Sequence, residues 1–462
     1  MLDRSFLSDI LNTLFERSMS KRSNKDQRSI NDLCMALLDT EGEVSGLSLA
    51  GSILTIYDTF EKEKKLEFFK FLNDILEINI SDLQEAITTF QSDDNAQNYS
   101  AISQLSEPKR LELLRRLNQP DGATLALVEM RTDLLNVLYE NPELERTDLD
   151  FQHLLRSWFN RGFLVLRQIS WETPASILEK IVEYEAVHAI GDWDELRRRL
   201  YPKDRRCFAF FHPSMPNEPL IFVEVALTAK VPSSIQQLLA NDREPQETAE
   251  TKVAVFYSIS NCQKGLSGIS FGNLLIKQVA AELRQEFSGL EKFVTLSPIP
   301  TFRKWLRSQK QTYNDNEMPT NNTKEEVVRQ LAGDYLLTAK KENGLPQDPV
   351  ARFHLGNGAQ IYDVHANADI SNKGLEQSLG AMVNYEYDLN KILLETGPSS
   401  IKSSPKGNNY TLDFSKELIK NEDLGTDEHT DLLVISFSST DYVGHKYGPD
   451  AEEVKSLSLI HI

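Results

Sequence analysis

A loop with three glycines separates a strand-like segment from a helix-like segment in the middle of the chain. The segment KVAVFYSIS runs into NCQKGLSGISFG, which contains Gly265, Gly268 and Gly272, and then into NLLIKQVAAELRQEF. Glycine lets the backbone approach a ligand closely, and the N–H groups that open a helix point at anions. The spacing matches neither a dinucleotide-binding fingerprint nor a P-loop. Two interpretations stay open, a phosphate cradle and a tight structural turn.

A polyanionic ligand at this loop would need cations close by. The formal net charge of the chain is −19, which argues against nucleic acid as a partner and would repel any polyanion at long range. Lysines and arginines do occur near the loop and after the next strand: Lys264, Lys277, Arg303, Lys304 and Arg307. They could gather at the ligand, or they could form an ordinary solvated surface.

A serine and a histidine farther along could bring a hydroxyl and an imidazole to one site. Ser297 ends the strand-like segment KFVTLS just before Pro298, and His354 lies in FHLGNGAQIYDVH, whose pattern predicts a strand. Histidine suits proton transfer near neutral pH. By residue type alone, however, Ser297 would be a turn residue and His354 a structural histidine.

The elements that must position these residues divide the chain into two kinds of sequence. Residues 1–160 predict helix after helix, as in QRSINDLCMALLD, where Ile30, Leu33 and Leu37 share one face. Beyond about residue 160 strands appear, and RCFAFF and LIFVEVAL are joined by a proline-rich turn. We therefore expect an α+β protein with an all-helical N-terminal domain and a mixed α/β domain after it.

Composition limits the location and the partners of the protein. No window has the roughly 18 uninterrupted apolar residues that a membrane span needs, so no membrane partner is expected. The N-terminus carries Asp3, Asp9 and Glu16, which transit peptides avoid, and this favours the cytoplasm. Three widely spaced cysteines predict neither a disulfide framework nor a zinc site.

Several blocks in order together resemble the malonyl-CoA decarboxylase family: FFHPSMPNEPLIFVEVAL, VFYSISNCQKGLSGISFGNLLIKQVAAEL, FVTLSPIPTFRKWL and FHLGNGAQIYDVHANAD. The resemblance implies a helical assembly domain at 1–160 and a catalytic domain at 161–391 that is similar to GNAT-type acyltransferases. It also implies conversion of malonyl-CoA to acetyl-CoA and CO2 without a metal or organic cofactor. A homotetramer is the assembly that the resemblance suggests.

Carried over by position, the resemblance assigns site residues. The catalytic serine and histidine would be Ser297 in LSPIP and His354 in FHLGNGA, and a supporting tyrosine would be Tyr387 in NYEY. The substrate-binding loop would consist of Gly265, Ser267, Gly268, Ile269, Ser270, Phe271, Gly272 and Asn273. This is the glycine loop that the residue pattern singled out separately.

The chemistry explains why such residues would be needed. Loss of CO2 from a malonyl thioester leaves an enolate, which preset hydrogen-bond donors stabilise and which a general acid must protonate. We expect His354 to protonate C2 of the enolate. Ser297 would hydrogen-bond the malonyl carboxylate or the histidine, and Tyr387 would help to position the pair.

The last part of the chain, residues 392–462, has a different character. The segment TDLLVISFSSTDYVGHKYGPD resembles a fragment of the alkaline-phosphatase superfamily, in which Asp441 and His445 would be metal ligands. Two ligands cannot hold a catalytic dizinc site, so no metal is expected. We interpret this segment as a foreign or chimeric tail.

Three alternatives to a decarboxylase stay open. The first is a CoA-dependent acyltransferase of the same fold, which would need an acceptor. The second is a CoA-binding or scaffold protein without catalysis, and the third is a phosphatase activity carried by the tail.

Overall fold

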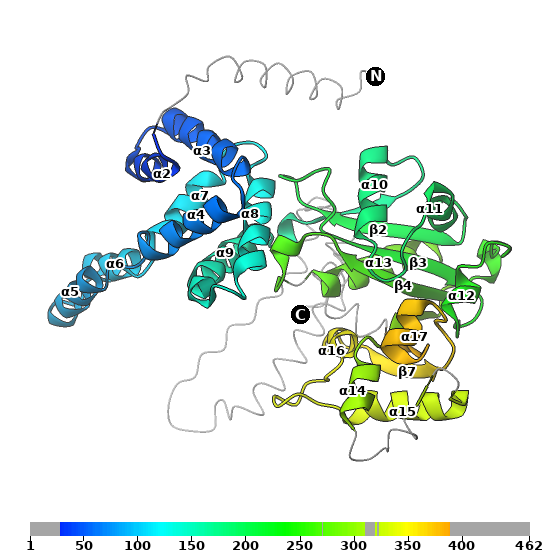
Figure 1. Cartoon of the computed structure of the whole chain (residues 1–462). Coiled ribbons are helices and arrows are strands. Elements are labelled where there is room, and N and C mark those ends of the chain that lie inside the picture. The colour runs from blue at the N-terminus through cyan, green and yellow to red at the C-terminus, as the bar shows by residue number, and fades with distance from the viewer. Residues whose placement is uncertain (1–27, 270, 310–318, 321–322, 389–462) are drawn as a thin grey trace, which may run out of the picture. The chain divides into compact units, whose positions relative to one another are not determined.

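The computed structural model describes residues 28–269, 271–309, 319–320 and 323–388, whose helices and strands are shown in Figure 1. These residues form two compact units. The first holds the residues up to Asn160 together with Gln263–Ile269, and the second holds Arg161–Cys262 and the described residues after Ile269. Part of the glycine loop thus packs with the helical unit, although its neighbours in sequence on both sides belong to the other unit.

Helices make up the first unit: α2 (Ile30–Asp39), α3 (Glu43–Asp58), α4 (Lys62–Asp74), α5 (Ile80–Ser92), α6 (Ala96–Leu105), α7 (Lys109–Leu117), α8 (Ala123–Val137), η2 (Pro142–Leu144), α9 (Glu145–Trp158) and η5 (Lys264–Leu266). A capping box between Ser29 and Asp32 begins α2, and Leu33 and Leu37 then turn inward. The short helix η5, which opens the glycine loop, packs against α8.

One sheet organises the second unit. Its strands are β1 (Val165–Ile169), β2 (Arg205–Phe211), β3 (Ile221–Thr228), β4 (Val253–Asn261), β5 (Lys292–Thr295), β6 (Ser297–Pro298), β7 (Gln360–His365) and β8 (Met382–Tyr387). Their order is β1-β2-β3-β4-β5-β8-β6, and β7 also pairs with β8. β4 and β5 are parallel, and the other pairs are antiparallel.

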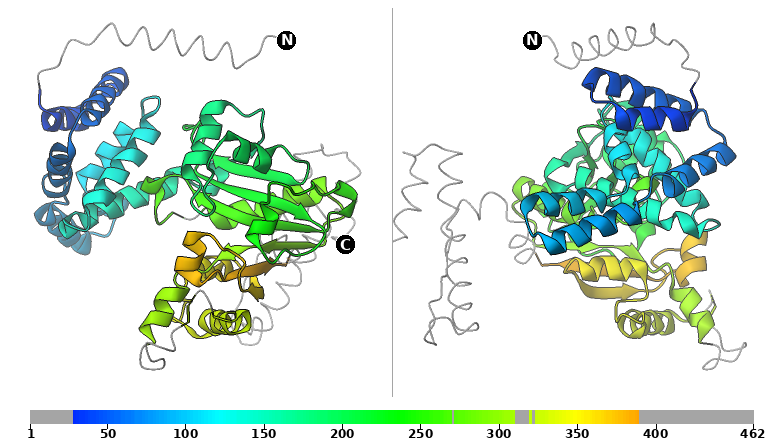
Figure 2. Two further views of the ribbon diagram at one scale, coloured as in Figure 1. Left: turned by 45° about the vertical axis from the view of Figure 1, so that its right-hand side comes forward. Right: turned by 90° about the vertical axis from the view of Figure 1, so that its left-hand side faces the viewer.

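Helices pack on both faces of this sheet (Figures 1 and 2). The described helices of this unit are η3 (Arg161–Phe163), α10 (Ala175–Tyr184), α11 (Trp193–Leu200), α12 (Ile235–Leu238), η4 (Thr248–Glu250), α13 (Gly272–Glu286), α14 (Phe302–Ser308), α15 (Glu325–Thr338), α16 (Pro349–Gly356) and α17 (Asn372–Ser378). On β3, Glu224 reaches Arg199 of α11, whereas Ile221 lies under the start of α13 at Gly272. Side chains alternate along a strand, so α11 and α13 cover opposite faces.

Strand β8 gathers the elements that carry the candidate site. It pairs with β5, with β6 and with β7. Ser297 lies opposite Val383, and Tyr387 lies opposite Phe293. The helix α16 ends just before β7, so its last turn is also held near β8.

The predicted α+β class, with helices first and a mixed α/β part after them, is confirmed. The expected strand around His354 is wrong, because His354 lies in the last turn of α16 and only Gln360–His365 is a strand. Asp348 accepts from the backbone N–H groups of Val350 and Ala351, and Pro349 fixes the first helical residue. This N-cap overrides the strand-like pattern that follows it.

The described helices include none with the length and apolar character that a membrane-spanning segment requires.

Candidate active site

Three side chains from distant parts of the sequence form a row in the second unit. The hydroxyl oxygen of Ser297 lies 3.2 Å from Nε2 of His354, and Nδ1 of His354 lies 2.8 Å from the phenol oxygen of Tyr387. All three side chains are buried. The structure therefore brings together the serine, the histidine and the tyrosine that the resemblance named.

A fourth residue, Thr295, sets the direction of the hydrogen bonds in this row. The hydroxyl of Ser297 donates to Oγ1 of Thr295 over 2.8 Å, and the backbone N–H of Tyr385 donates to the same oxygen over 3.1 Å. A hydroxyl has one hydrogen, so Ser297 cannot also donate to His354. Nε2 of His354 must then carry a hydrogen and donate to Ser297, while Nδ1 accepts from Tyr387.

Burial keeps the row uncharged. It lowers the pKa of His354 to about 3 and raises the pKa of Tyr387 above its ordinary value. Aromatic rings surround the imidazole: Tyr385 stacks on it with ring centres 4.7 Å apart, and Phe353 meets it edge-on at 5.0 Å. Since the ordinary pKa of histidine is about 6.5, His354 is neutral at physiological pH. An exposed histidine, by contrast, titrates near neutral pH.

Asp348 joins the two segments that carry the serine and the histidine. One carboxylate oxygen caps α16, as described above, and the other accepts from the hydroxyl of Thr301 over 2.9 Å and from its N–H over 3.3 Å. The Thr301 hydroxyl also lies 2.7 Å from the phenol oxygen of Tyr335. Asp348 thus fixes the start of the histidine helix to the chain just beyond Ser297. The sequence did contain its signal, an aspartate followed by proline at a helix start.

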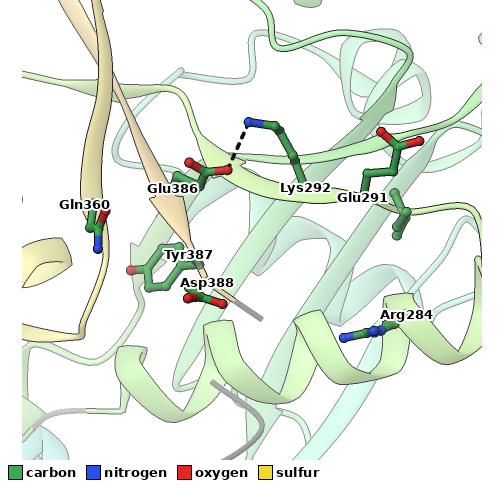
Figure 3. Close-up of a pocket in the computed structure, with 8 residues that line it drawn as sticks. Arg284, Glu291, Lys292, Gln360, Glu386, Tyr387 and Asp388 are labelled. Carbon is green, nitrogen blue, oxygen red and sulfur yellow. Dashed lines mark hydrogen bonds and ion pairs between the residues drawn. The ribbon is translucent and has the colours of Figure 1, made fainter. Parts of the chain in front are cut away.

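An open pocket of about 540 Å³ has Tyr387 among its lining residues (Figure 3). Its lining includes Tyr387, the last residue of β8, Asp388, which follows it, and Arg284 from α13. An ion pair of 3.1 Å between Lys292 and Glu386 lies in the same pocket. The pocket therefore places charged groups and water-accessible space beside an otherwise buried row.

The first half of the glycine loop is held by the helical unit. A side chain at Gly265 would meet the backbone oxygen of Val128 on α8 at 1.9 Å, so only glycine fits there. Gly268 has a φ of +81°, which also favours glycine. The guanidinium of Arg131 donates to the backbone oxygens of Gly265 and Ser267. Sequence reasoning missed Arg131, because contacts with backbone carbonyls leave no recognisable pattern of side chains.

The second half of the loop lies beside the histidine helix. A Cβ added to Gly272, at the start of α13, would lie 2.4 Å from the ring of Phe353. Phe353 directly precedes His354 and touches its ring, so Gly272 lets α13 begin close to the row. Phe271 is buried, and Ile269 packs in the first unit. Ser270 and the side chain of Asn273 lie outside the described residues.

The cations near the loop contact different parts of the chain. Lys264 bonds Asn136 in the helical unit, and Lys277 is buried in α13. Arg303 donates to the backbone oxygen of Leu375 over 3.0 Å. These contacts support structural roles for Lys264 and Arg303.

The predicted tail at 392–462, with Asp441 and His445, lies outside the described residues. Within the described part of the chain, no group of three or more histidine, cysteine, aspartate or glutamate side chains could hold a metal ion.

The fold and the site define a class of protein: a mixed α/β domain with a glycine loop and a buried hydroxyl–imidazole–phenol row, together with a helical domain. The model of the malonyl-CoA decarboxylase C-terminal domain matches residues 162–326 and 312–397, and that of the N-terminal domain matches residues 76–159. The chain therefore belongs to the malonyl-CoA decarboxylase family, as its sequence predicted.

Individual relatives agree with this assignment. A mitochondrial malonyl-CoA decarboxylase of Rattus norvegicus is 36% identical over 363 residues, which cover 69% of this chain and 71% of the relative. The solved structure of a malonyl-CoA decarboxylase from Rhodopseudomonas palustris is 46% identical, with a TM-score of 0.74 over 80% of this chain and 96% of that one. A structure from Agrobacterium vitis is 44% identical, with a TM-score of 0.72, and covers 78% and 93%.

The predicted second resemblance is confirmed as a short partial match. An alkaline phosphatase of Synechococcus elongatus is 48% identical over 61 residues, which cover 13% of this chain and 11% of the phosphatase.

Proposed function

We propose that this chain converts malonyl-CoA to acetyl-CoA and CO2. Membership of the family supports the proposal, and so do the names of the relatives. The observation that carries it is the buried, uncharged row of Ser297, His354 and Tyr387. Such a row can give a proton to carbon without placing a permanent charge beside the substrate.

The reaction needs one proton per turnover. The bond between C2 and the malonyl carboxylate breaks, CO2 leaves, and the electron pair passes into the thioester as an enolate. C2 then takes up a proton, which comes ultimately from water. A hydrogen-bond donor that is well placed at the enolate oxygen would stabilise the transition state by about 3–4 kcal/mol.

The direction of the hydrogen bonds supports specific roles in this step. His354 would give its Nε2 proton to C2, and the phenol of Tyr387 would replace that proton at Nδ1. Water in the open pocket beside Tyr387 would then protonate the phenolate and leave hydroxide, and a return of the imidazole hydrogen from Nδ1 to Nε2 would complete the cycle. Ser297 would hold the malonyl carboxylate or the imidazole until CO2 has left. Because His354 is neutral, it would act as a neutral donor and not as an imidazolium.

The remaining assignments follow from the family and belong to the same proposal. The coenzyme A part of the substrate would lie on the loop from Gly265 to Asn273. The protein would assemble as a homotetramer and act in the cytoplasm. The rat relative is named as mitochondrial, so a location experiment with the full chain is the test of that last point.

The direct test is to incubate the full chain with malonyl-CoA in D2O and without any acyl acceptor. We expect equal amounts of CO2 and acetyl-CoA, and one deuterium in the acetyl methyl group. Absence of CO2 from folded protein would refute the proposal. Transfer of the acyl group to an added amine, without release of CO2, would support the acyltransferase alternative instead.

A further inference from the structure

The geometry points to Arg131 as a positioning residue for the substrate loop, which gives the helical unit a part in substrate recognition as well as in assembly. This inference rests on the proposed function, since it takes the glycine loop as the coenzyme A site. Its support comes from contacts inside the first unit, which contains both α8 and residues 263–269.

Arg131 divides its hydrogen bonds between a carboxylate and the loop. On one side, Nε and one terminal nitrogen donate to the two oxygens of Asp148, over 2.7 and 3.3 Å. On the other side, the second terminal nitrogen donates to the backbone oxygens of Gly265 and Ser267, over 2.7 and 2.9 Å. The side chain is 1% exposed, so water cannot easily replace these partners.

These bonds determine how the loop presents its backbone. A planar trans peptide places its N–H opposite its C=O. By holding the oxygen of Ser267, Arg131 therefore also fixes the direction of the Gly268 N–H, in a residue whose φ of +81° few other residue types adopt. Gly265 is pressed against the backbone of Val128 and leaves the loop little freedom to move toward α8. Arg131 thus preorganises backbone donors of the kind that bind phosphate groups.

The same unit offers a matched control in Arg110. Its side chain is also buried, at 3% exposure, and its Nε donates to Asp150 over 2.5 Å. A terminal nitrogen of Arg110 donates to the backbone oxygens of Leu72 and Asn73, which lie in the last turn of α4 and not in the glycine loop. Replacement of either arginine removes a buried, ion-paired guanidinium, but only Arg131 contacts the loop.

The experiment compares Arg131→Met, Arg131→Lys and Arg110→Met in the full chain. We measure KM and kcat for malonyl-CoA, the Kd for free coenzyme A by calorimetry, and amide hydrogen exchange in residues 263–269. For both Arg131 variants we expect KM and Kd to rise about tenfold, because the substrate must then order a mobile loop. We expect kcat to change less than twofold and exchange in the loop to become faster. Arg110→Met should lose stability with KM and Kd unchanged.

The lysine variant keeps a positive charge beside Asp148 but lacks the fork that reaches both sides, so it remains informative if Arg131→Met does not fold. Unchanged KM, Kd and loop exchange in a folded Arg131 variant would overturn the inference. An equal rise of KM in Arg110→Met would also overturn it, since the effect would then be general loss of stability. A wild-type chain that neither binds nor decarboxylates malonyl-CoA would instead refute the proposed function.

Discussion

The glycine loop and the Ser297–His354–Tyr387 row, the two regions that we propose contact the substrate, differ in charge. The first half of the glycine loop is held by a permanent charge, the guanidinium of Arg131, which is paired with Asp148. The row of Ser297, His354 and Tyr387 contains no charged side chain at neutral pH, because burial keeps its imidazole neutral and its phenol protonated.

The difference fits the role that we propose for each place. A loop that only binds can be fixed by a charge, provided that the charge is fully paired and its hydrogen bonds are made. A row that moves a proton works better without fixed charges. In a medium of low dielectric, a fixed charge nearby would interact strongly with the transferred proton and favour one of its positions. Variants of the loop should therefore change KM, and variants of the row should change kcat.

Replacement of the imidazole should give the largest effect. In His354→Asn the proton donor is lost, while the amide can still bond Ser297, so we expect kcat to fall by about 10³-fold or more. The Kd for coenzyme A should stay within twofold of the wild-type value. Rapid-quench assays and calorimetry measure the two quantities. A variant that keeps the full rate would show that the row does not carry the chemistry.

Removal of the phenol oxygen should give a smaller loss. In Tyr387→Phe the Nδ1 atom of His354 loses its donor, and we expect kcat to fall by about 10- to 100-fold with little change in KM. Tyr385→Phe is the matched comparison, because the Tyr385 hydroxyl is buried without a hydrogen-bond partner although its ring stacks on His354. We expect Tyr385→Phe to lower kcat far less than Tyr387→Phe does. Equal losses in the two variants would argue against a proton path through Tyr387.

Removal of the clamp between the two segments should lower both stability and rate. In Asp348→Ala the cap of α16 and the bonds to Thr301 are lost, which we expect to reduce the free energy of unfolding by about 2 kcal/mol. Misplacement of His354 should reduce kcat severalfold as well. Chemical denaturation and steady-state kinetics test this. Ser29→Ala removes a cap from α2 in the helical unit, so it should reduce stability without a change in kcat.

The smallest effect should be that of pH on kcat. Since the pKa of His354 is lowered to about 3, kcat should show no inflection near pH 6.5 from this residue.

In the unfolded chain the same imidazole binds a proton near pH 6.5, so its contribution to stability is present above that pH and is lost as pH falls toward 3, by at most about 1.4 kcal/mol per pH unit. Thermal unfolding of wild type and His354→Asn between pH 4 and 8 isolates this term, because His188, whose pKa is also lowered, is common to both. A clear inflection of kcat near 6.5 that disappears in His354→Asn would contradict a buried, neutral imidazole.

Sequence patterns located most of the elements that position the site. The strands around Cys207, Val223 and Val255, and the helix that follows the glycine loop, lie where hydrophobic alternation and periodicity placed them. The helix that carries His354 was predicted as a strand from the pattern of FHLGNGAQIYDVH, which begins after the Asp348–Pro349 helix start. A local cap with two backbone hydrogen bonds decided the outcome.

By itself, the sequence determined the family and the position of the glycine loop, and it predicted Ser297, His354 and Tyr387 as site residues, because each lies in a contiguous motif that can be read without knowledge of contacts. Only the tertiary structure decided that Arg131 holds the loop, that Thr295 orients the serine, and that His354 is a neutral donor. The physical reason is the same in all three cases. Hydrogen bonds to distant backbone or hydroxyl groups, and the exclusion of water, depend on which parts of the folded chain surround a side chain and not on its neighbours in sequence.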